Sequence, residues 1–575
     1  MSQRVYDLIG VGFGPGNLAL CIALHESEEA RAKGFSMYFL ERQPKFAWHP
    51  SLLLPGAQLQ VSPIKDLATI RDPTSSFTFL NFLHWQGRLV QYINREEKVP
   101  SRREWSAYLA WAARRMDQYA HYSQSVQDIQ PVEQDGKVAY LRVISKNLLT
   151  NEIETLYARN VSTAVGGFAN VPAVISSLYD FHYGSSNASR VVHSSTFLPQ
   201  MSYLDSILQR EATTSDEPLR FAVIGGGQSS AEIMRYLRDH FPKADLTMIF
   251  RASALAPSDD SSFVNSAAFD PESVSSFWES GIHQRRAQLD EFRRTNYSVV
   301  RSDLLAELYE MVYDQDIDYE DAYSPSKGIV RIMSNTALVG AEQLSNARIR
   351  LETCTHAGEQ IVESSEYDAV FLGTGFKRSA ATLPFFNTLA REFPLLSEEG
   401  TERLREQELN LDAQIATAKD PDAMRATVRG ITRDYRLVPT DPSRWMRDNH
   451  SILSMHPTVV PKIPAARSVR ERMLSTSRST SRSGSRATSR AGSPKNSPRA
   501  LSSSNIEVAS NLYRPQAPCN LYVFGCNEHT HGLSDSLMSM VAHRANVVSA
   551  SLMAATQYPE PKVNGINAPP CPTIQ

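Results

Sequence analysis

Two segments of this chain repeat one local pattern about 215 residues apart. Each begins with a short apolar run, passes through a glycine-rich turn and an apolar helix-like run, and ends with a second apolar run. The first segment covers residues 5–41 and the second covers residues 219–251. A strand, a glycine turn, a helix and a strand in this order form the nucleotide-binding half of a Rossmann-like domain. We therefore expect an α/β protein with two Rossmann-like dinucleotide-binding domains.

The first turn carries Gly10, Gly12 and Gly14 directly before the helix. Glycine allows a tight turn and a close approach to a pyrophosphate, and the helix N-terminus offers free N–H groups. Pro15 stands where the common fingerprint has its third glycine, so the strict pattern is broken. The strand after the helix ends in Glu41, which suits a ribose hydroxyl; an ordinary surface acid is the alternative. The order of the elements favours nucleotide binding.

The second turn carries Gly225 and Gly227, followed by Gln228 and Ser229 at the start of the next helix. Here the following strand ends in Arg251 instead of an acid. A guanidinium forms charge-assisted hydrogen bonds to phosphate oxygens, so Arg251 suits the 2′-phosphate of NADPH, with a hydroxyl contact from Ser229. An ordinary surface arginine is the alternative. Two dinucleotide sites imply electron transfer between two cofactors, so we expect FAD at the first turn and NADPH at the second.

The chain has 575 residues, too many for one hydrophobic core. Its 42% hydrophobic and 21% charged residues and its net charge of -3 are typical of a globular protein without a nucleic-acid footprint. No apolar stretch is long enough to span a membrane, and the first residues do not resemble a signal peptide. The five cysteines lack Cys-x-x-Cys spacing, which argues against a disulfide framework, a zinc site or a redox dithiol. We expect a cytoplasmic enzyme without a metal.

The composition changes sharply between residues 465 and 505, where serine and arginine dominate and large apolar residues nearly vanish. Such a segment cannot bury enough surface to offset its ordering entropy, so we predict a disordered insertion at 465–505. The predicted organisation is an FAD-binding domain at 1–205 that residues 506–560 complete, an NADPH-binding domain at 215–380 with a substrate-binding insert near 255–330, a substrate-binding or connecting region at 381–464, and a flexible tail at 561–575.

Three polar residues outside the glycine turns are candidates for binding a substrate. Lys65 lies in an apolar context and suits a substrate carboxylate, although a surface pair with Asp66 is an equal alternative. Asn265 and Asn296 belong to two polar loop segments, and an asparagine amide suits both ends of an amino acid. A single asparagine in a loop is more often a turn residue. Residue chemistry alone therefore leaves both interpretations open.

Two histidines, His529 and His531, stand two residues apart in the segment 527–535. No third ligand follows at a convincing spacing, so a metal site is disfavoured. A loop packed against the flavin, with Gly532 allowing a close backbone approach, is the better interpretation.

Taken together, these motifs resemble those of the fungal L-ornithine N5-monooxygenases, flavin-dependent N-hydroxylating monooxygenases of hydroxamate siderophore biosynthesis. The segment 368–376 is similar to the Asp-x-x-x-Leu-x-Thr-Gly-aromatic motif of that family. Pro63 and the serine- and arginine-rich insertion depart from the family pattern. The other matching stretches are residues 10–18, 46–50, 60–83, 225–232, 263–265 and 527–535.

The resemblance implies roles for individual residues. It implies that ornithine is bound in a smaller helical region, with its carboxylate held by Lys65. The other ornithine-binding residues that it implies are Asn265, Asn296 and Ser539. It further implies that Trp48 and Gln60 lie by the flavin, and that Ser229 and Arg251 lie by the adenosine phosphate of NADPH.

The reaction implied by the resemblance is N5-hydroxylation of L-ornithine, in which NADPH reduces FAD and O2 then forms a C4a-hydroperoxyflavin. The flavin carries the chemistry, so no obligate catalytic side chain is expected. One alternative is an L-lysine N6-monooxygenase, because one methylene separates two substrates by only about 1–3 kcal/mol. Another is a flavin-dependent NADPH oxidase or reductase without N-hydroxylation. By analogy with the family, we also expect a homotetramer.

Overall fold

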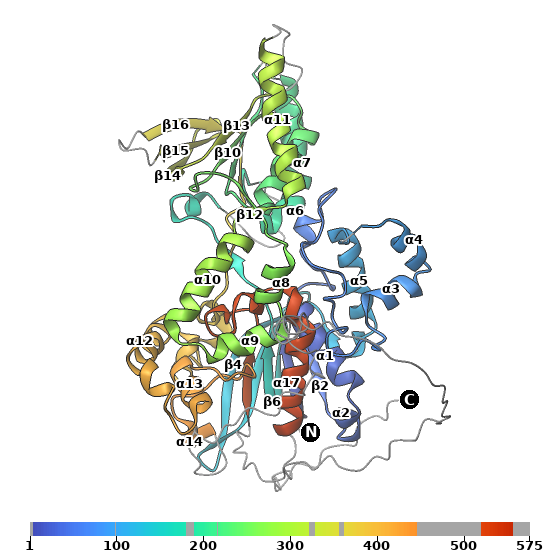
Figure 1. Ribbon diagram of the computed structural model, residues 1–575, viewed down its shortest axis with the longest axis vertical. Coiled ribbons are helices and arrows are strands. Elements are labelled where there is room, and N and C mark those ends of the chain that lie inside the picture. Colours follow the sequence, from blue (N-terminus) through green and yellow to red (C-terminus); the bar gives the residue numbers. More distant parts are fainter. Residues whose placement is uncertain are drawn as a thin grey trace, which may run out of the picture.

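The structure is a computed structural model that describes residues 4–97, 99–179, 189–214, 217–320, 328–355, 362–445 and 519–555. Two sheet-based units are stacked along the long axis of the molecule, the first at the bottom and the second at the top of Figure 1. The insertion expected at 465–505 and the tail expected at 561–575 lie outside the described residues.

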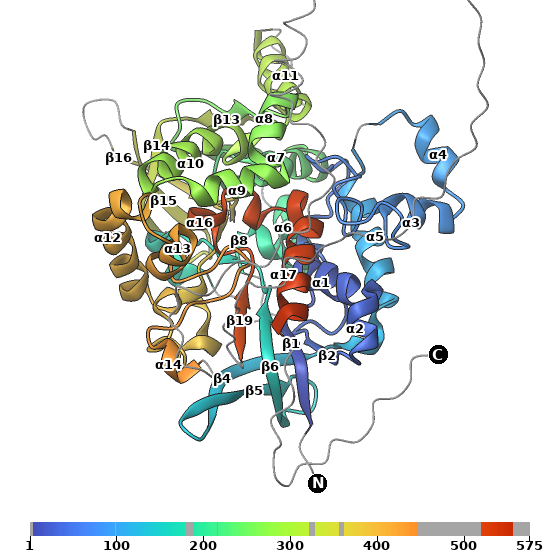
Figure 2. The ribbon, with the colours of Figure 1, turned by 60° about the horizontal axis from the view of Figure 1, so that its bottom comes forward.

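The first unit contains the strand, turn, helix and strand expected near the N-terminus. Strands β1 (Val5–Val11) and β2 (Met37–Leu40) pair in parallel, and helices α1 (Pro15–Glu26) and α2 (Glu28–Ala32) connect them. Helix α1 is apolar on nearly all sides because it lies between the sheet and helix α17 (Val541–Ala555), which runs beside it in Figure 2. The prediction of this unit is confirmed.

Strand β6 (Ile153–Thr163) lies at the centre of the first sheet and pairs in parallel with β1. Its first half pairs antiparallel with β5 (Lys137–Asn147), and its second half pairs in parallel with β19 (Asn520–Val523). Because β19 and α17 come from the far end of the chain, distant segments share one sheet unit. The remaining strands of this sheet are β3 (Ala120–His121) and β4 (Gln124–Gln134).

The second unit is also confirmed. Strand β9 (Arg220–Ile224), helix α7 (Gln228–His240) and strand β10 (Asp245–Ile249) follow one another as expected. The sheet is parallel, with the strand order β13-β10-β9-β17-β8. Its other strands are β8 (Val191–His193), β13 (Val330–Met333) and β17 (Ala369–Leu372), and a neighbouring antiparallel sheet contains β14 (Thr336–Gln343), β15 (Ile349–Thr355) and β16 (Val362–Tyr367).

The limits of the two units stay a prediction. Strand β8 and helix α6 (Phe197–Thr214) precede the second glycine turn, yet β8 pairs with β17 of the second sheet. The limit expected at residue 205 therefore falls inside α6. Strand pairing favours a limit before β8.

Two short strands join the units where the chain leaves each sheet. Strand β7 (Phe168–Ala169) follows β6, strand β18 (Phe376–Lys377) follows β17, and the two pair antiparallel. Next to them, Asn170 donates from its backbone N to the Gly375 carbonyl over 2.9 Å. Strands β6 and β17 are therefore the strands after which the chain leaves each sheet.

Helices surround the two units and fill the space at the level where the units meet (Figure 1). The insert between the strands β11 (Ala256–Pro257) and β13 is largely helical, as expected for a helical region, and the fold class is confirmed. Across the described residues, none of the helices combines the length and the apolarity that crossing a membrane requires. The other helices of the described ranges are α3 (Phe79–Trp85), α4 (Leu89–Asn94), α5 (Arg102–Arg114), α8 (Ser262–Ala268), α9 (Pro271–Glu279), α10 (Ile282–Asn296), α11 (Ser302–Glu320), α12 (Glu398–Ile415), α13 (Pro421–Arg429), α14 (Pro442–Trp445) and α16 (Glu528–His531).

Candidate cofactor and substrate site

The first glycine turn is rigid and open at the helix N-terminus. Gly12 has a φ of 81°, and a Cβ there would lie 2.8 Å from the Ala164 carbonyl oxygen, so the position requires glycine. At Gly14, the N-cap of α1, that oxygen is the nearest neighbour, at 3.8 Å. The buried Asn17 side chain donates to the carbonyls of Val11, over 3.2 Å, and of Gly12, over 2.7 Å. This arrangement fits a pyrophosphate at the start of α1.

Other residues of the first unit support the turn. A Cβ at Gly10 would lie 2.1 Å from the Phe39 ring, so this glycine serves the packing of β1 against β2. Pro15 occupies the first turn of α1, where its missing N–H costs nothing. The Glu41 carboxylate accepts from the backbone N of Phe13 over 2.7 Å, so the acid is bonded to the turn itself and is more than a surface residue.

The two other predicted flavin neighbours lie on the segment that follows the first unit. Trp48 is half-buried at the edge of the first core and lies edge-on against the His49 ring, 5.1 Å between centres. Gln60 is exposed. Contact of either side chain with FAD stays a prediction.

The second glycine turn is contacted and hydrogen-bonded by residues of the insert. Gly225 has a φ of 125°, and a Cβ there would lie 2.5 Å from the Gly373 carbonyl oxygen. Gly227 is the N-cap of α7 and faces the backbone of Ser298. The Gln228 side chain accepts from the backbone N of Arg301 over 2.9 Å. The turn is therefore held by the chain that directly follows α10.

The predicted adenosine-phosphate residues lie at the carboxyl side of this sheet. Ser229 is half-buried in the first turn of α7, and Arg251 is exposed two residues after β10 ends. Strand ends in an open parallel sheet are where nucleotides bind. Both positions fit a 2′-phosphate.

The prediction that Asn265 and Asn296 lie in loops is wrong. Ser261 caps α8 by accepting from the Val264 backbone N, so the helix begins before Asn265. Asn296 is the last residue of α10. The Asp259 backbone N, three residues before α8, donates to the carbonyl of Thr295 over 3.2 Å, so the segment that leads into α8 contacts the end of α10.

Lys65 reaches the end of α8. Its Nζ lies 3.4 Å from the Phe269 carbonyl oxygen, to which it donates, and 5.4 Å from the centre of the Phe269 ring. The Phe269 backbone N in turn donates to the carbonyl of Asn265. Burial lowers the pKa of Lys65, and the charge of Asp270 opposes that shift. An ammonium has three donors, so Lys65 retains capacity for a substrate carboxylate.

The alternative of a surface pair between Lys65 and Asp66 is wrong. Asp66 is buried and accepts from the backbone N of Ala68, Thr69 and Phe79. These bonds fix the turn after Lys65 and use the carboxylate within the first unit. Asp66 thereby holds the segment that presents the lysine.

Ser539 carries a buried hydroxyl group. The residue is 1% exposed, and within the described part of the chain its Oγ has no hydrogen-bond partner. Buried polar atoms are nearly always satisfied, so a ligand hydroxyl, amine or carboxylate fits beside it. The Asn527 Oδ1 and the Thr163 Oγ1, at the carboxyl end of β6, are in the same condition.

Tyr297 and Glu528, to which the sequence assigned no role, connect these candidates. Tyr297, next to Asn296, donates to the Glu528 carboxylate and lies 3.1 Å from the Ser536 hydroxyl. Burial and the Glu528 charge raise the pKa of Tyr297 to about 12. The end of α10 is therefore bonded to the segment that leads to Ser539. The signal that could have found Tyr297 and Glu528 is that each lies beside a residue or segment predicted from the sequence.

His531 is a packing residue. Its ring stacks on Tyr435 at 4.2 Å between centres and tilts against Trp278 at 5.3 Å. Its Nε2 donates to the Arg433 carbonyl over 3.2 Å, and burial lowers the pKa of His531 to about 3. Throughout the described ranges, no group of three potential ligands could hold a metal ion.

The segment that contains His531 lies near the first turn. Arg544 of α17 donates to the Asp535 carboxylate over 3.1 Å, and its Nη2 lies 3.6 Å from where a Cβ at Gly16 would be. The Asp535 carboxylate also accepts from the Asn527 backbone N over 2.7 Å. These bonds are compatible with the loop expected against the flavin, which stays a prediction.

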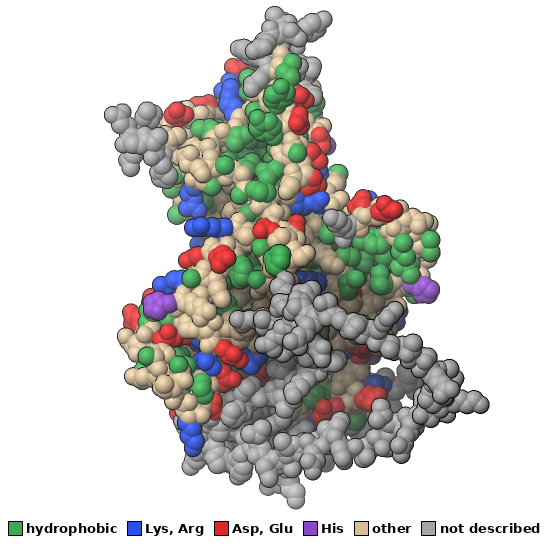
Figure 3. Space-filling view, viewed as in Figure 1, with side chains coloured by type: hydrophobic (Ala, Val, Ile, Leu, Met, Phe, Trp, Pro, Cys, Tyr) green, Lys and Arg blue, Asp and Glu red, His purple; other side chains and the backbone are tan. Residues whose placement is uncertain are grey.

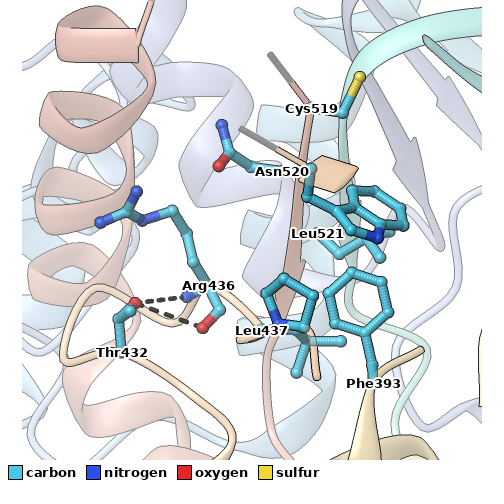
Figure 4. A pocket seen from close by; sticks show the side chains of 9 residues that line it. Phe393, Thr432, Arg436, Leu437, Cys519, Asn520 and Leu521 are labelled. Atoms are coloured by element: carbon cyan, nitrogen blue, oxygen red, sulfur yellow. Dashed lines mark hydrogen bonds between the residues drawn. The ribbon is translucent and has the colours of Figure 1, made fainter. Parts of the chain in front are cut away.

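A separate pocket lies at the edge of the first sheet (Figure 4). Its walls come from the turn after α13 and from β19, and the Thr432 hydroxyl in it bonds to the backbone of Arg436. None of the predicted cofactor or substrate residues lines it. The lining residues are Phe393, Thr432, Arg436, Leu437, Pro439, Trp445, Cys519, Asn520 and Leu521.

Comparison with known proteins gives one consistent result. The sequence profile described as L-lysine 6-monooxygenase/L-ornithine 5-monooxygenase matches residues 4–378. The L-ornithine N(5)-monooxygenase of Mycosarcoma maydis is 41% identical over 593 aligned positions, which cover 96% of this chain and 85% of that protein.

Two solved structures agree with this match. The ornithine hydroxylase PvdA from Pseudomonas aeruginosa superposes with a TM-score of 0.68 at 28% identity, covering 96% of this chain and 100% of the other. The Kutzneria sp. 744 ornithine N-hydroxylase KtzI, with reduced FAD, NADP+ and L-ornithine, superposes with a TM-score of 0.66 at 26% identity over 96% of this chain and 99% of its own. With two glycine turns of the expected geometry and this match over most of its length, the chain belongs to the L-lysine 6-monooxygenase/L-ornithine 5-monooxygenase family.

Proposed function

We propose that the chain is an FAD-dependent monooxygenase that uses NADPH and O2 to hydroxylate the N5 amine of L-ornithine, a first step toward a hydroxamate siderophore. Two links carry the proposal: Lys65 donates to the Phe269 carbonyl while the Phe269 backbone N bonds to Asn265, and Tyr297, next to Asn296, contacts Ser536, three residues before Ser539. Relatives named for this activity and the KtzI complex support the choice of substrate and cofactors.

The protein's task is to bind, orient and desolvate the substrate. Bound FAD, once reduced by NADPH, supplies the oxygen chemistry. Lys65 binds the ornithine carboxylate, while the amides of Asn265 and Asn296 and the Ser539 hydroxyl orient the rest. A free alkyl amine has a pKa of about 10.4, so a dry environment favours the neutral amine that has to react.

The test is product formation by the purified enzyme with FAD, NADPH and O2, comparing ornithine with lysine and measuring peroxide. We expect N5-hydroxyornithine with little peroxide, and a preference for ornithine over lysine of about 10-fold or more, as one methylene allows. Equal turnover of the two amines would contradict a preference for ornithine, and faster turnover of lysine would favour the lysine monooxygenase. NADPH oxidation that yields peroxide alone would favour the oxidase.

We also propose a homotetramer with two different interfaces between copies. A tetramer with dihedral symmetry needs two such surfaces, and two separate apolar patches are exposed in Figure 3, over α3 and α4 and along α11. Exposed apolar patches mark interaction sites. The first contains Leu80, Trp85, Val90 and Ile93, and the second contains Tyr309, Tyr313 and Ile317.

Mass measurement in solution tests this assembly. Trp85→Glu and Tyr313→Glu, made separately, are each expected to give dimers, because each breaks one interface. A monomeric parent enzyme would contradict the proposal, as would a parent mass that neither substitution changes.

We propose a cytoplasmic location, which the thiols support. Cys21 and Cys354 are buried free thiols, as expected in a reducing compartment. Fractionation of cells that express the tagged chain tests the proposal, and recovery in an organelle fraction would contradict it.

A further inference from the structure

A buried cluster of three charged side chains lies outside the residues assigned to the cofactors and the substrate. Glu408 of α12 is only 4% exposed, and its two oxygens accept from two different arginines. Arg285 of α10 donates from Nη2 over 2.6 Å, and Arg429, at the end of α13, donates from Nε over 2.7 Å. Buried charges are costly unless they are paired and hydrogen-bonded. The cluster therefore fixes the geometry around it.

Both arginines also donate to backbone carbonyls just before α10, and Arg285 reaches α16 as well. Arg285 donates from Nε to the His529 carbonyl over 2.9 Å and from Nη1 to the Ser280 carbonyl over 2.8 Å. Arg429 donates from Nη2 to the same Ser280 carbonyl over 3.1 Å. One carboxylate thus connects α12 and α13 to the start of α10 and to α16.

Helix α10 contacts the same segment a second time at its other end. Tyr297, directly after α10, donates to Glu528, the neighbour of His529. Asn296 precedes Tyr297, and Ser536, which also contacts Glu528, lies three residues before Ser539. The segment 527–536 is therefore held at both ends of α10, with candidate substrate residues at one end and the Glu408 cluster at the other.

We propose that Glu408 is a positioning residue for the substrate-binding part of the site, because through Arg285 and Arg429 it holds α10 and the segment 527–536 as one rigid body. This inference rests on the proposed function. Without the carboxylate, two buried guanidinium groups lose their counter-charge, and the two elements shift relative to each other. Asn296 and Ser539 then no longer face the substrate together, although neither touches Glu408.

The substitution Glu408→Gln keeps the side-chain volume and removes the charge. In the FAD-loaded enzyme, we expect the KM for ornithine to rise about tenfold and the share of NADPH consumed as peroxide to increase, because a misplaced substrate reacts poorly. Anaerobic flavin reduction by NADPH should stay within about twofold. Glu408→Asp, which restores the charge at shorter reach, should recover part of the coupling.

Glu104→Gln is the matched control. Glu104 of α5 is 6% exposed and pairs with Arg88 and Arg95, away from the substrate insert. The control substitution likewise removes the charge of a buried carboxylate that pairs with two arginines. It therefore tests whether general destabilisation is enough to raise the KM and the peroxide share. Equal rises in KM and peroxide in both variants, or no rise in the folded Glu408→Gln enzyme, would overturn the proposal.

Hydrogen–deuterium exchange gives a readout that does not need turnover. In Glu408→Gln, residues 282–297 and 527–536 should exchange faster, whereas residues 220–235 should not change. Unchanged exchange in the first two segments overturns the positioning role even if the enzyme hydroxylates ornithine. Wild-type enzyme that does not hydroxylate ornithine contradicts the proposed function, and the exchange result then decides the rigid link by itself.

Discussion

The two glycine turns have similar backbones but differ in what holds them. The first is fixed by its own unit, since Asn17 and Glu41 bond to its backbone from within a few dozen residues. The second is fixed by the insert, since Ser298 packs against Gly227 and Arg301 bonds to Gln228. The difference indicates that the flavin turn is stabilised by contacts within its own unit, whereas the NADPH turn is stabilised by the same insert that contains candidate substrate residues.

The largest effects are expected from alanine at the two strained glycines. Gly12→Ala places a Cβ against the Ala164 carbonyl at a φ of 81°, so we expect bound FAD to fall to about a tenth or less, and all activity with it. Gly225→Ala has a similar clash at the other turn, but should retain FAD and slow flavin reduction about 100-fold. Flavin absorbance per protein and anaerobic reduction rates measure both. Loss of FAD from Gly225→Ala would break the comparison.

A smaller effect is expected at Lys65, which belongs to neither turn. A charge-assisted hydrogen bond contributes about 1.5–3 kcal/mol, so Lys65→Ala should raise the KM for ornithine about 10- to 100-fold. NADPH oxidation should slow much less, because the lysine does not support either turn. Steady-state kinetics with both readouts test this. Equal losses would rule out a carboxylate-binding role.

Arg251→Ala tests the difference between the two units after their second strands, where the first unit has the acid Glu41 and the second has Arg251. Loss of one exposed phosphate contact should raise the KM for NADPH about 10-fold and leave that for NADH nearly unchanged. The ratio of the two KM values is the measurement. A parallel rise for both nucleotides would mean that Arg251 does not read the 2′-phosphate.

The smallest effect concerns the pH dependence of stability, through His531 in the segment 527–536. Because the pKa of His531 is about 3 in the folded protein against 6.5 ordinarily, its stabilisation is present above pH 6.5 and is lost as the pH falls toward 3. Between pH 8 and pH 6 the free energy of unfolding should drop by about 0.8 kcal/mol from this group. Denaturant titrations of the parent and His531→Asn test this, and identical pH slopes would contradict it.

The sequence predicted what short segments encode. Gly10 to Gly14 and Gly225 to Gly227, each between an apolar run and a helix, were sufficient for the two units. Asn265 was misplaced because the chain around it is polar, although Ser261 is a helix cap that marks α8. The pairing of Glu408 with Arg285, 123 residues away, has no local signal. It depends on how α10, α12 and α13 pack, which only the structure gives.

The position of β19 has a consequence for biosynthesis. Asn520 bonds to Asn160 across 360 residues, so the sheet that carries the FAD turn lacks one strand until almost the whole chain has left the ribosome. The parallel sheet of the second unit uses only residues 191–372 and can close earlier. The N-terminal unit is thus the last to be completed, because loop closure over such a separation is slow. Synthesis that stops before residue 520 leaves an enzyme with an intact NADPH sheet and an unfinished flavin sheet.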